Sequence, residues 1–182
     1  MIGWLKEAIQ VLPKSYSDFF VYCTLTGLRA SEAIEFVKLL IYGRTVNSYY
    51  YNPERQCLEH FRFPQIFLRR TKTAYISIVD DEIIEIAKSI DKTPPSYHGL
   101  KMVYRHTKLS MQMNYYRKIY ASYLRQSGIE TEIIDLLQCR VPKSAFARHY
   151  FRPSADQGKS IGSAENTQAK NTLLRLDCIK VG

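Results

Sequence analysis

Three arginines of this chain stand where they could bind the phosphate of a nucleic acid. Arg29 lies in the segment Thr-Gly-Leu-Arg-Ala-Ser-Glu, which ends at Glu32, while Arg117 lies near the start of a later helix and Arg140 ends the segment Leu-Leu-Gln-Cys-Arg. A guanidinium offers a planar fork of N–H donors that matches two phosphate oxygens, which a lysine cannot imitate. Such donors stabilise the charge that gathers on a phosphodiester during its cleavage, each by roughly 3–4 kcal/mol.

A tyrosine and a lysine could supply the remaining chemistry. Tyr150 follows the third arginine by ten residues and stands among Arg148, His149 and Arg152. A phenol has an unperturbed pKa of about 10, and neighbouring cations favour its phenolate, which is a nucleophile. Lys72 stands in a polar turn between two expected strands, where it could protonate a leaving oxygen.

The order and spacing of these residues resemble the catalytic domain of the tyrosine recombinases, the phage-integrase family. That family has Thr-Gly-Leu-Arg-x-x-Glu at its first arginine, then a lysine in a β-hairpin turn, His-x-x-Arg on a helix, Leu-Gly-His or a similar segment, and a tyrosine downstream. The resemblance covers about residues 5–152. It is closest to the integrases of spindle-shaped archaeal viruses and related plasmids, which also have arginine in place of the Leu-Gly-His histidine.

The resemblance implies a fold, an activity and a set of site residues. The fold is α+β and mainly α-helical, with a small antiparallel sheet near residues 49–79. The activity is site-specific DNA recombination through a 3′-phosphotyrosine intermediate, for the integration or excision of a viral or plasmid element, without metal or cofactor. Tyr150 is the implied nucleophile and Lys72 the general acid, while Glu32 orients a catalytic side chain. The complete implied catalytic set is Tyr150, Arg29, Arg117, Arg140, Lys72 and Asn114.

Asn114 departs from the family pattern. It stands where most members have histidine, and where the archaeal viral branch has lysine. An asparagine amide can donate a hydrogen bond to a phosphate oxygen, but it cannot shuttle a proton. We therefore expect weaker activity, or a larger share of the proton transfer at Lys72.

Two other functions fit the same residues. A type IB topoisomerase-like enzyme would nick and relax DNA with this active site and without recombination. An inactive remnant of a split integrase gene would bind DNA only. Family members carry an N-terminal DNA-binding domain, and the 28 residues before Arg29 are too few for one. The expectation is therefore an isolated catalytic domain or the product of a divided gene.

The charge of the chain favours double-stranded DNA as its partner. The 182 residues include 26 Lys+Arg against 17 Asp+Glu, which gives a net charge of +9 and a pI of about 9.4. Such a surplus indicates a polyanionic partner, with nucleic acid first and an anionic membrane surface second, provided that the basic residues share one surface rather than several unrelated solvated faces. The expected DNA contacts come from three stretches without acidic residues: Arg69, Arg70, Lys101, Arg105, Lys108, Lys118, Lys143, Arg148 and His149.

Composition limits the other classes. An apolar fraction of 46% excludes a wholly disordered chain. No apolar run approaches the ~20 residues of a membrane span, so no membrane partner is expected. The four cysteines have long, irregular spacings, which favours neither a zinc site nor a disulfide framework and is typical of reduced cysteines in the cytoplasm of a host cell.

Apolar periodicity predicts the elements that position these residues. Helices are expected over 4–12, from about 15 to a stop at Gly27, over 33–41, after Asp80, and over 99–107, 112–127, 131–138 and 143–151. Strands are expected at 66–68 and 75–78, on either side of the turn that holds Lys72.

The sequence is expected to form a folded domain followed by a C-terminal tail. Residues 1–152 form the catalytic domain, and residues 153–182 form a tail, because periodicity fades there into Ser, Gly, Asn, Gln and Lys. The tail is either flexible or docked on a neighbouring protomer. The resemblance implies that protomers multimerise on DNA and form a tetrameric synapse.

Overall fold

The structure of the chain, a computed structural model, describes residues 2–42, 47–69, 72–74, 76–90, 95–110 and 112–140. Several expectations lie outside these described residues: the nucleophile Tyr150, the basic residues Arg70, Lys143, Arg148 and His149, the helix over 143–151 and the tail 153–182.

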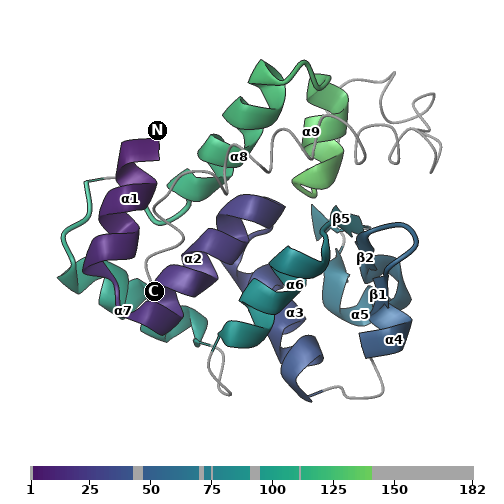
Figure 1. Cartoon of the computed structure of the whole chain (residues 1–182), viewed down its shortest axis with the longest axis horizontal. Coiled ribbons are helices and arrows are strands. Elements are labelled where there is room, and N and C mark those ends of the chain that lie inside the picture. Colours follow the sequence, from purple (N-terminus) through teal and green to yellow (C-terminus); the bar gives the residue numbers. More distant parts are fainter. Residues whose placement is uncertain are drawn as a thin grey trace.

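The described chain is mainly helical and carries a small antiparallel sheet, which confirms the α+β class predicted from the sequence (Figure 1). The helical elements are α1 (Ile2–Val11), α2 (Lys14–Thr26), α3 (Ala30–Tyr42), α4 (Asn47–Tyr50), the 3-10 turn η1 (His60–Arg62), α5 (Pro64–Phe67), α6 (Asp81–Ser89), α7 (Tyr97–His106), α8 (Tyr115–Gln126) and α9 (Thr131–Leu137). The strands are β1 (Tyr51–Asn52), β2 (Cys57–Glu59), β3 (Leu68–Arg69), β4 (Lys72–Thr73) and β5 (Ile76–Ile78).

Helix α2 lies at the centre of the core, where α1, α6 and α8 pack against it. From Phe19 to its end, every residue of α2 is buried. A helix that is buried around its whole circumference must be covered on all sides, and neighbouring helices provide that cover here. Aromatic rings fill the contacts: Tyr22 stacks on Phe36 of α3 at 4.9 Å between centroids, and Phe20 meets Tyr116 of α8 edge-on at 6.0 Å.

The sheet has the strand order β1–β2–β5, and β3 pairs with β4 in a separate hairpin. The expected strand at 66–68 is mostly wrong. Pro64 starts a short helix that includes Ile66 and Phe67, since proline is well tolerated in a first helical turn. The expected strand at 75–78 is confirmed over Ile76–Ile78, but its partner is β2, in the register Leu58 to Ser77.

Some helix boundaries carry the expected signals, while α3 and α7 begin two or three residues before, and α8 three residues after, the expected positions. Asp80 caps α6 by accepting a hydrogen bond from the Ile83 backbone N–H at 3.0 Å. Gly27 ends α2 and Gly128 follows α8, both with positive φ. Helix α2 begins at Lys14, directly after Pro13, without a side-chain cap.

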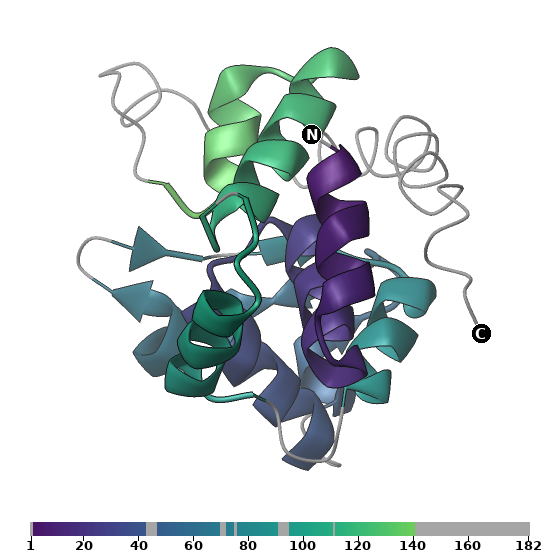
Figure 2. The ribbon, with the colours of Figure 1, turned by 90° about the vertical axis from the view of Figure 1, so that its left-hand side faces the viewer.

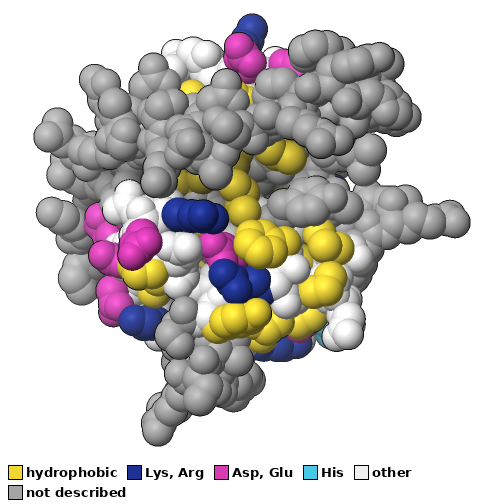
Figure 3. All heavy atoms as spheres, turned by 90° about the vertical axis from the view of Figure 1, so that its right-hand side faces the viewer, with side chains coloured by type: hydrophobic (Ala, Val, Ile, Leu, Met, Phe, Trp, Pro, Cys, Tyr) yellow, Lys and Arg dark blue, Asp and Glu magenta, His cyan; other side chains and the backbone are white. Residues whose placement is uncertain are grey.

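A buried carboxylate stabilises the sheet. Glu59 is 2% exposed at the end of β2, where it accepts hydrogen bonds from Arg62 and from the Asn52 side chain at 3.0 Å, with Arg55 at 3.7 Å. Burial raises the pKa of Glu59, but the bonds from Arg62 and Asn52 and the charges of both arginines lower it more, so the net pKa lies below its usual value. Acidic and basic side chains also lie beside one another among hydrophobic ones on the described part of the face that holds the sheet (Figure 3).

Glu59→Gln is expected to lower the free energy of unfolding by about 1–2 kcal/mol at neutral pH, since hydrogen bonds to a charged group are lost. A pKa that is lower in the folded state adds stability above the unfolded pKa of about 4.3, and this stability disappears as pH falls through the folded pKa. The difference between wild type and variant should therefore be constant above about pH 5 and shrink below about pH 4. Denaturant unfolding across about pH 3–7 measures it.

The exposed Glu54 is the control for this experiment, since Glu54→Gln removes a carboxylate from the adjoining turn. Its effect should stay within about 0.5 kcal/mol at every pH. An equal loss in both variants would contradict the role given to Glu59.

Candidate phosphate-binding site

Arg29 lies at the start of α3, where the Glu32 side chain binds both its backbone N–H and its guanidinium. Its carbonyl accepts the backbone N–H groups of Glu32 and Ala33, so Arg29 caps the helix. The Glu32 carboxylate accepts from the Arg29 backbone N–H at 3.0 Å and from its Nη1 at 2.8 Å. The bond between the Glu32 carboxylate and the Arg29 backbone N–H is one half of a capping box, and the other half is absent because an arginine side chain has no acceptor for the Glu32 N–H. It gives Glu32 the orienting position expected from the sequence.

Gly27 brings α2, α3 and α8 close together. It ends α2 with φ +66°, in the left-handed region that favours glycine. A Cβ built on Gly27 would lie 2.4 Å from Cδ1 of Tyr120, a ring on α8. The Gly27 carbonyl accepts a hydrogen bond from Arg117 Nε at 3.0 Å. Glycine is therefore required here both by the backbone angle and by the neighbouring ring.

Gly27→Ala is expected to lower the free energy of unfolding by about 2–4 kcal/mol, because left-handed strain adds to overpacking against Tyr120. Gly128→Ala is the matched control. Gly128 has φ +87°, but a Cβ added there would meet nothing within 4 Å, so only the strain remains, about 1 kcal/mol. Thermal or denaturant unfolding compares the two variants. Equal losses would contradict the close packing of Tyr120 on Gly27.

The turn after α9 collects the three arginines. The backbone N–H groups of Cys139 and Arg140 bond the carbonyls of Leu136 and Asp135 at 2.9 and 2.8 Å, and Cys139 has φ +58°. This is a Schellman motif with cysteine at the position that glycine usually occupies. The motif turns the next two carbonyls, those of Gln138 and Cys139, toward the arginines that approach from the other helices.

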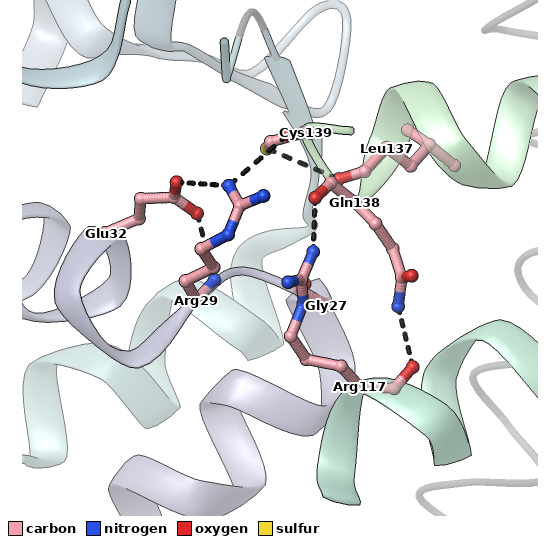
Figure 4. A network of polar contacts seen from close by, with 7 residues as sticks. All are labelled: Gly27, Arg29, Glu32, Arg117, Leu137, Gln138 and Cys139. Carbon is pink, nitrogen blue, oxygen red and sulfur yellow. Dashed lines mark hydrogen bonds and ion pairs between the residues drawn. The ribbon is translucent and has the colours of Figure 1, made fainter. Parts of the chain in front are cut away.

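Arg29 and Arg117 bind these consecutive carbonyls, as Figure 4 shows. Arg117 donates from Nη2 to the Gln138 carbonyl, and Arg29 donates from Nη1 to the Cys139 carbonyl at 3.3 Å. The third arginine, Arg140, is the next residue of the chain. The partial negative charge of carbonyls at a helix C-terminus offsets part of the repulsion between these cations. The structure thus brings together three arginines that are up to 111 residues apart in sequence.

Arg117 differs from the other two arginines in its charge balance. Arg29 pairs with Glu32 at 2.8 Å and Arg140 with Asp135 at 3.2 Å, whereas Arg117 has no ion pair among the described residues. Arg117 is half-buried, and burial and the charges of Arg29 and Arg140 lower its pKa more than the charges of Tyr116 and Glu32 raise it. Positive charge that is partly buried and not neutralised favours the binding of an anion.

Two further predicted residues, Asn114 and Lys72, lie outside the turn that collects the three arginines. Asn114 is exposed at the N-cap of α8, one helical turn before Arg117, although no contact joins its side chain to the three arginines among the described residues. The backbone places Lys72 at the start of β4, opposite Arg69 of β3. Figure 2 shows the β3–β4 hairpin projecting from the body of the molecule. Lys72 therefore lies on a hairpin, but in strand β4 rather than in the expected turn, and the paired strands are β3 and β4 rather than the expected 66–68 and 75–78.

The predicted DNA contacts of the described helices are exposed. Lys101 and Arg105 lie on α7, Lys108 follows that helix, and Lys118 lies on α8. Lys101 also lies over the ring of Tyr97 at 4.9 Å. These side chains are free of the core and accessible to a polyanion.

Sequence reasoning gave no role to three residues of this site. Gln138, Cys139 and Asp135 supply the carbonyls, the turn and the carboxylate that hold the arginines. One signal was available, because a helix end directly before Arg140 must expose carbonyl groups that need donors. Nothing in the sequence indicates that these donors come from Arg29 and Arg117.

The three described cysteines are free and buried, and no group of three or more potential metal ligands occurs among the described residues. None of the described helices is long and apolar enough to span a membrane.

Comparison with known proteins gives no match: no family model fits the chain, and no curated protein or solved structure is significantly similar to it. A functional assignment therefore depends on the geometry of the arginine site and on the order of motifs in the sequence.

Proposed function

We propose that this chain is the catalytic domain of a site-specific DNA recombinase of the tyrosine class, with the fold of that family. The observation that carries the proposal is the half-buried Arg117, which makes no ion pair among the described residues and meets Arg29 and Arg140 at the turn after α9. A phosphodiester supplies the missing negative charge, and guanidinium forks match its oxygens. The sequence motifs then select phosphoryl transfer to a tyrosine as the reaction.

In this mechanism the arginines bind the non-bridging oxygens of the scissile phosphate. Two of the five N–H donors of Arg117 bind carbonyls of the described residues, which leaves donors for the phosphate. The Tyr150 oxygen attacks phosphorus, the bond from phosphorus to the 5′-oxygen breaks, and Lys72 protonates that oxygen. The phosphotyrosine ester retains the energy of the broken linkage, so a 5′-hydroxyl can reverse the step and rejoin a strand.

Double-stranded DNA is the proposed partner, together with further protomers that assemble on it. The exposed basic side chains of α7 and α8 add to the positive charge of the three arginines. Contacts of this kind bind phosphates of any sequence and weaken as salt rises. The proposed setting is the cytoplasm of a host cell, where a viral or plasmid element integrates or is excised.

Covalent trapping tests the proposal. The protein is incubated with a pool of random-sequence duplexes that carry a nick, so that a short 5′-hydroxyl strand diffuses away after cleavage and the adduct cannot reverse. Denaturation with detergent, capture of protein-linked DNA and sequencing should recover DNA attached through its 3′ end. The yield should be unchanged by a chelator of divalent metals.

The outcomes separate the three candidate functions. Adducts with strand exchange between two duplexes support a recombinase. Adducts with relaxation of supercoiled DNA and no exchange would favour the topoisomerase-like enzyme instead. DNA binding without any adduct would overturn the proposed activity and leave a DNA-binding remnant.

A further inference from the structure

Gln138 and Arg117 hold one another through two hydrogen bonds that run in opposite directions. Arg117 Nη2 donates to the Gln138 backbone carbonyl, and Gln138 Nε2 donates to the Arg117 backbone carbonyl at 2.6 Å (Figure 4). The two residues are 21 positions apart, on α8 and in the turn after α9. This pair, the Gln138–Arg117 clasp, joins the two elements that bring Arg117 and Arg140 together.

The clasp fixes both ends of the arginine side chain. Gln138 Nε2 holds the backbone from which the side chain starts, while the Gln138 carbonyl holds the guanidinium at its tip. The Gly27 carbonyl adds a third fixed point at Nε. A long side chain with both ends fixed has little freedom to leave the geometry that a transition state requires, and small misplacements lower rates strongly.

The Gln138 amide is not explained by packing alone. The residue is fully buried, yet its Oε1 has no hydrogen-bond partner among the described residues. A buried acceptor without a partner is costly, so an apolar side chain of the same length would fill this position at least as well. Among the described residues, the hydrogen bond that the amide does make is the bond to Arg117.

We infer that Gln138 is a positioning residue, which acts through Arg117 to hold its guanidinium ready for the scissile phosphate. The inference rests on the proposed function, since it assigns to Gln138 a part in the same reaction. Gln138 itself does not touch the DNA in this arrangement.

The test uses Gln138→Met in the full chain, with cleavage measured on the trapped-adduct substrate. Methionine keeps the length of the side chain and removes both the donor and the unpartnered Oε1. The cleavage rate at saturating DNA should fall about 10- to 100-fold, as for residues that orient catalytic groups, whereas the dissociation constant for DNA should change less than about threefold. Gln126→Met, at an exposed position of α8, is the control and should leave both quantities unchanged.

A double-mutant cycle separates positioning from general damage. Since Gln138 acts through Arg117, the loss caused by Gln138→Met should nearly vanish when Arg117 is already lysine. A purely structural role would give the same loss in both backgrounds, together with a lower melting temperature in each. That result, or a rate for Gln138→Met within about twofold of wild type, overturns the inference.

If the wild-type protein forms no adduct, the proposed function is overturned but the inference about Gln138 is not. A measurement that does not depend on catalysis then tests the inference. The Arg117 Nε–H proton, hydrogen-bonded to the Gly27 carbonyl, should give a slowly exchanging NMR signal in wild type and in Gln126→Met. Gln138→Met should accelerate its exchange at least about tenfold, because the guanidinium is less firmly held. Unchanged exchange would contradict positioning whatever the activity of the protein.

Discussion

Replacement of Tyr150 by phenylalanine is expected to abolish the covalent DNA adduct and to leave DNA affinity nearly unchanged. The variant lacks the oxygen that attacks phosphorus, but it retains the arginines and lysines that bind phosphates. No adduct should be detectable in the trapping assay, because the phosphotyrosine bond cannot form without the attacking oxygen. Detergent-resistant adducts and a binding titration, made on the same DNA pool, measure the two effects.

Other tyrosines provide the controls and the alternative. Tyr97→Phe removes a hydroxyl from an exposed ring of α7 and should form adducts at the wild-type rate. An adduct that persists in Tyr150→Phe would require another nucleophile. Tyr120 is a poor candidate, because it is 7% exposed against Gly27 and burial raises its pKa well above the usual value.

The helical elements could be predicted from sequence because local signals agree with tertiary packing. The apolar repeat of α6 directly follows its cap residue Asp80, and the helix begins where these two signals predict. The hairpin of Lys72 was predicted only in part, because its strands are β3 and β4 rather than the expected 66–68 and 75–78, and Lys72 lies in β4 rather than in the turn.

The sheet could not be predicted in the same way. Its strands have two or three residues each, too few for a period of two to be distinguished from a short helix. Pro64 turns the segment before β3 into α5, and β5 pairs with β2 rather than with the strand nearest in sequence. Pairing of this kind depends on packing of the whole domain.

The arginines of the site and the carboxylate of Glu32 were found by residue type and spacing, but the backbone carbonyls that hold the arginines were not. A sequence motif can select Arg29, Arg117 and Arg140, because the chemistry needs guanidinium groups. The bonds that hold two of them go to backbone carbonyls, and every residue has one. Which carbonyls become acceptors is decided by the Schellman turn after α9, a property of the folded chain.

Arg117→Lys is the substitution expected to affect catalysis most among the described residues. We expect the cleavage rate at saturating DNA to fall roughly 10²–10³-fold, the range observed when one donor to a developing oxyanion is removed. Lysine preserves the positive charge, so DNA affinity should fall by a factor of about three or less. Single-turnover cleavage with excess protein separates the rate of the chemical step from binding.

The reason for this size of effect lies in the geometry of the guanidinium. Arg117 donates from Nε to the Gly27 carbonyl and from Nη2 to the Gln138 carbonyl, and donors on the same plane remain for the phosphate. A lysine ammonium is a single point with three rotatable donors, so it cannot span both carbonyls and face the phosphate in one fixed plane. Arg125→Lys is the matched control on α8, because Arg125 is exposed and makes only a long hydrogen bond of 3.4 Å to the Ile129 carbonyl among the described residues. If Arg117→Lys cleaves within about threefold of Arg125→Lys, charge alone suffices at this position, and the fork geometry of Arg117 has no part in the reaction.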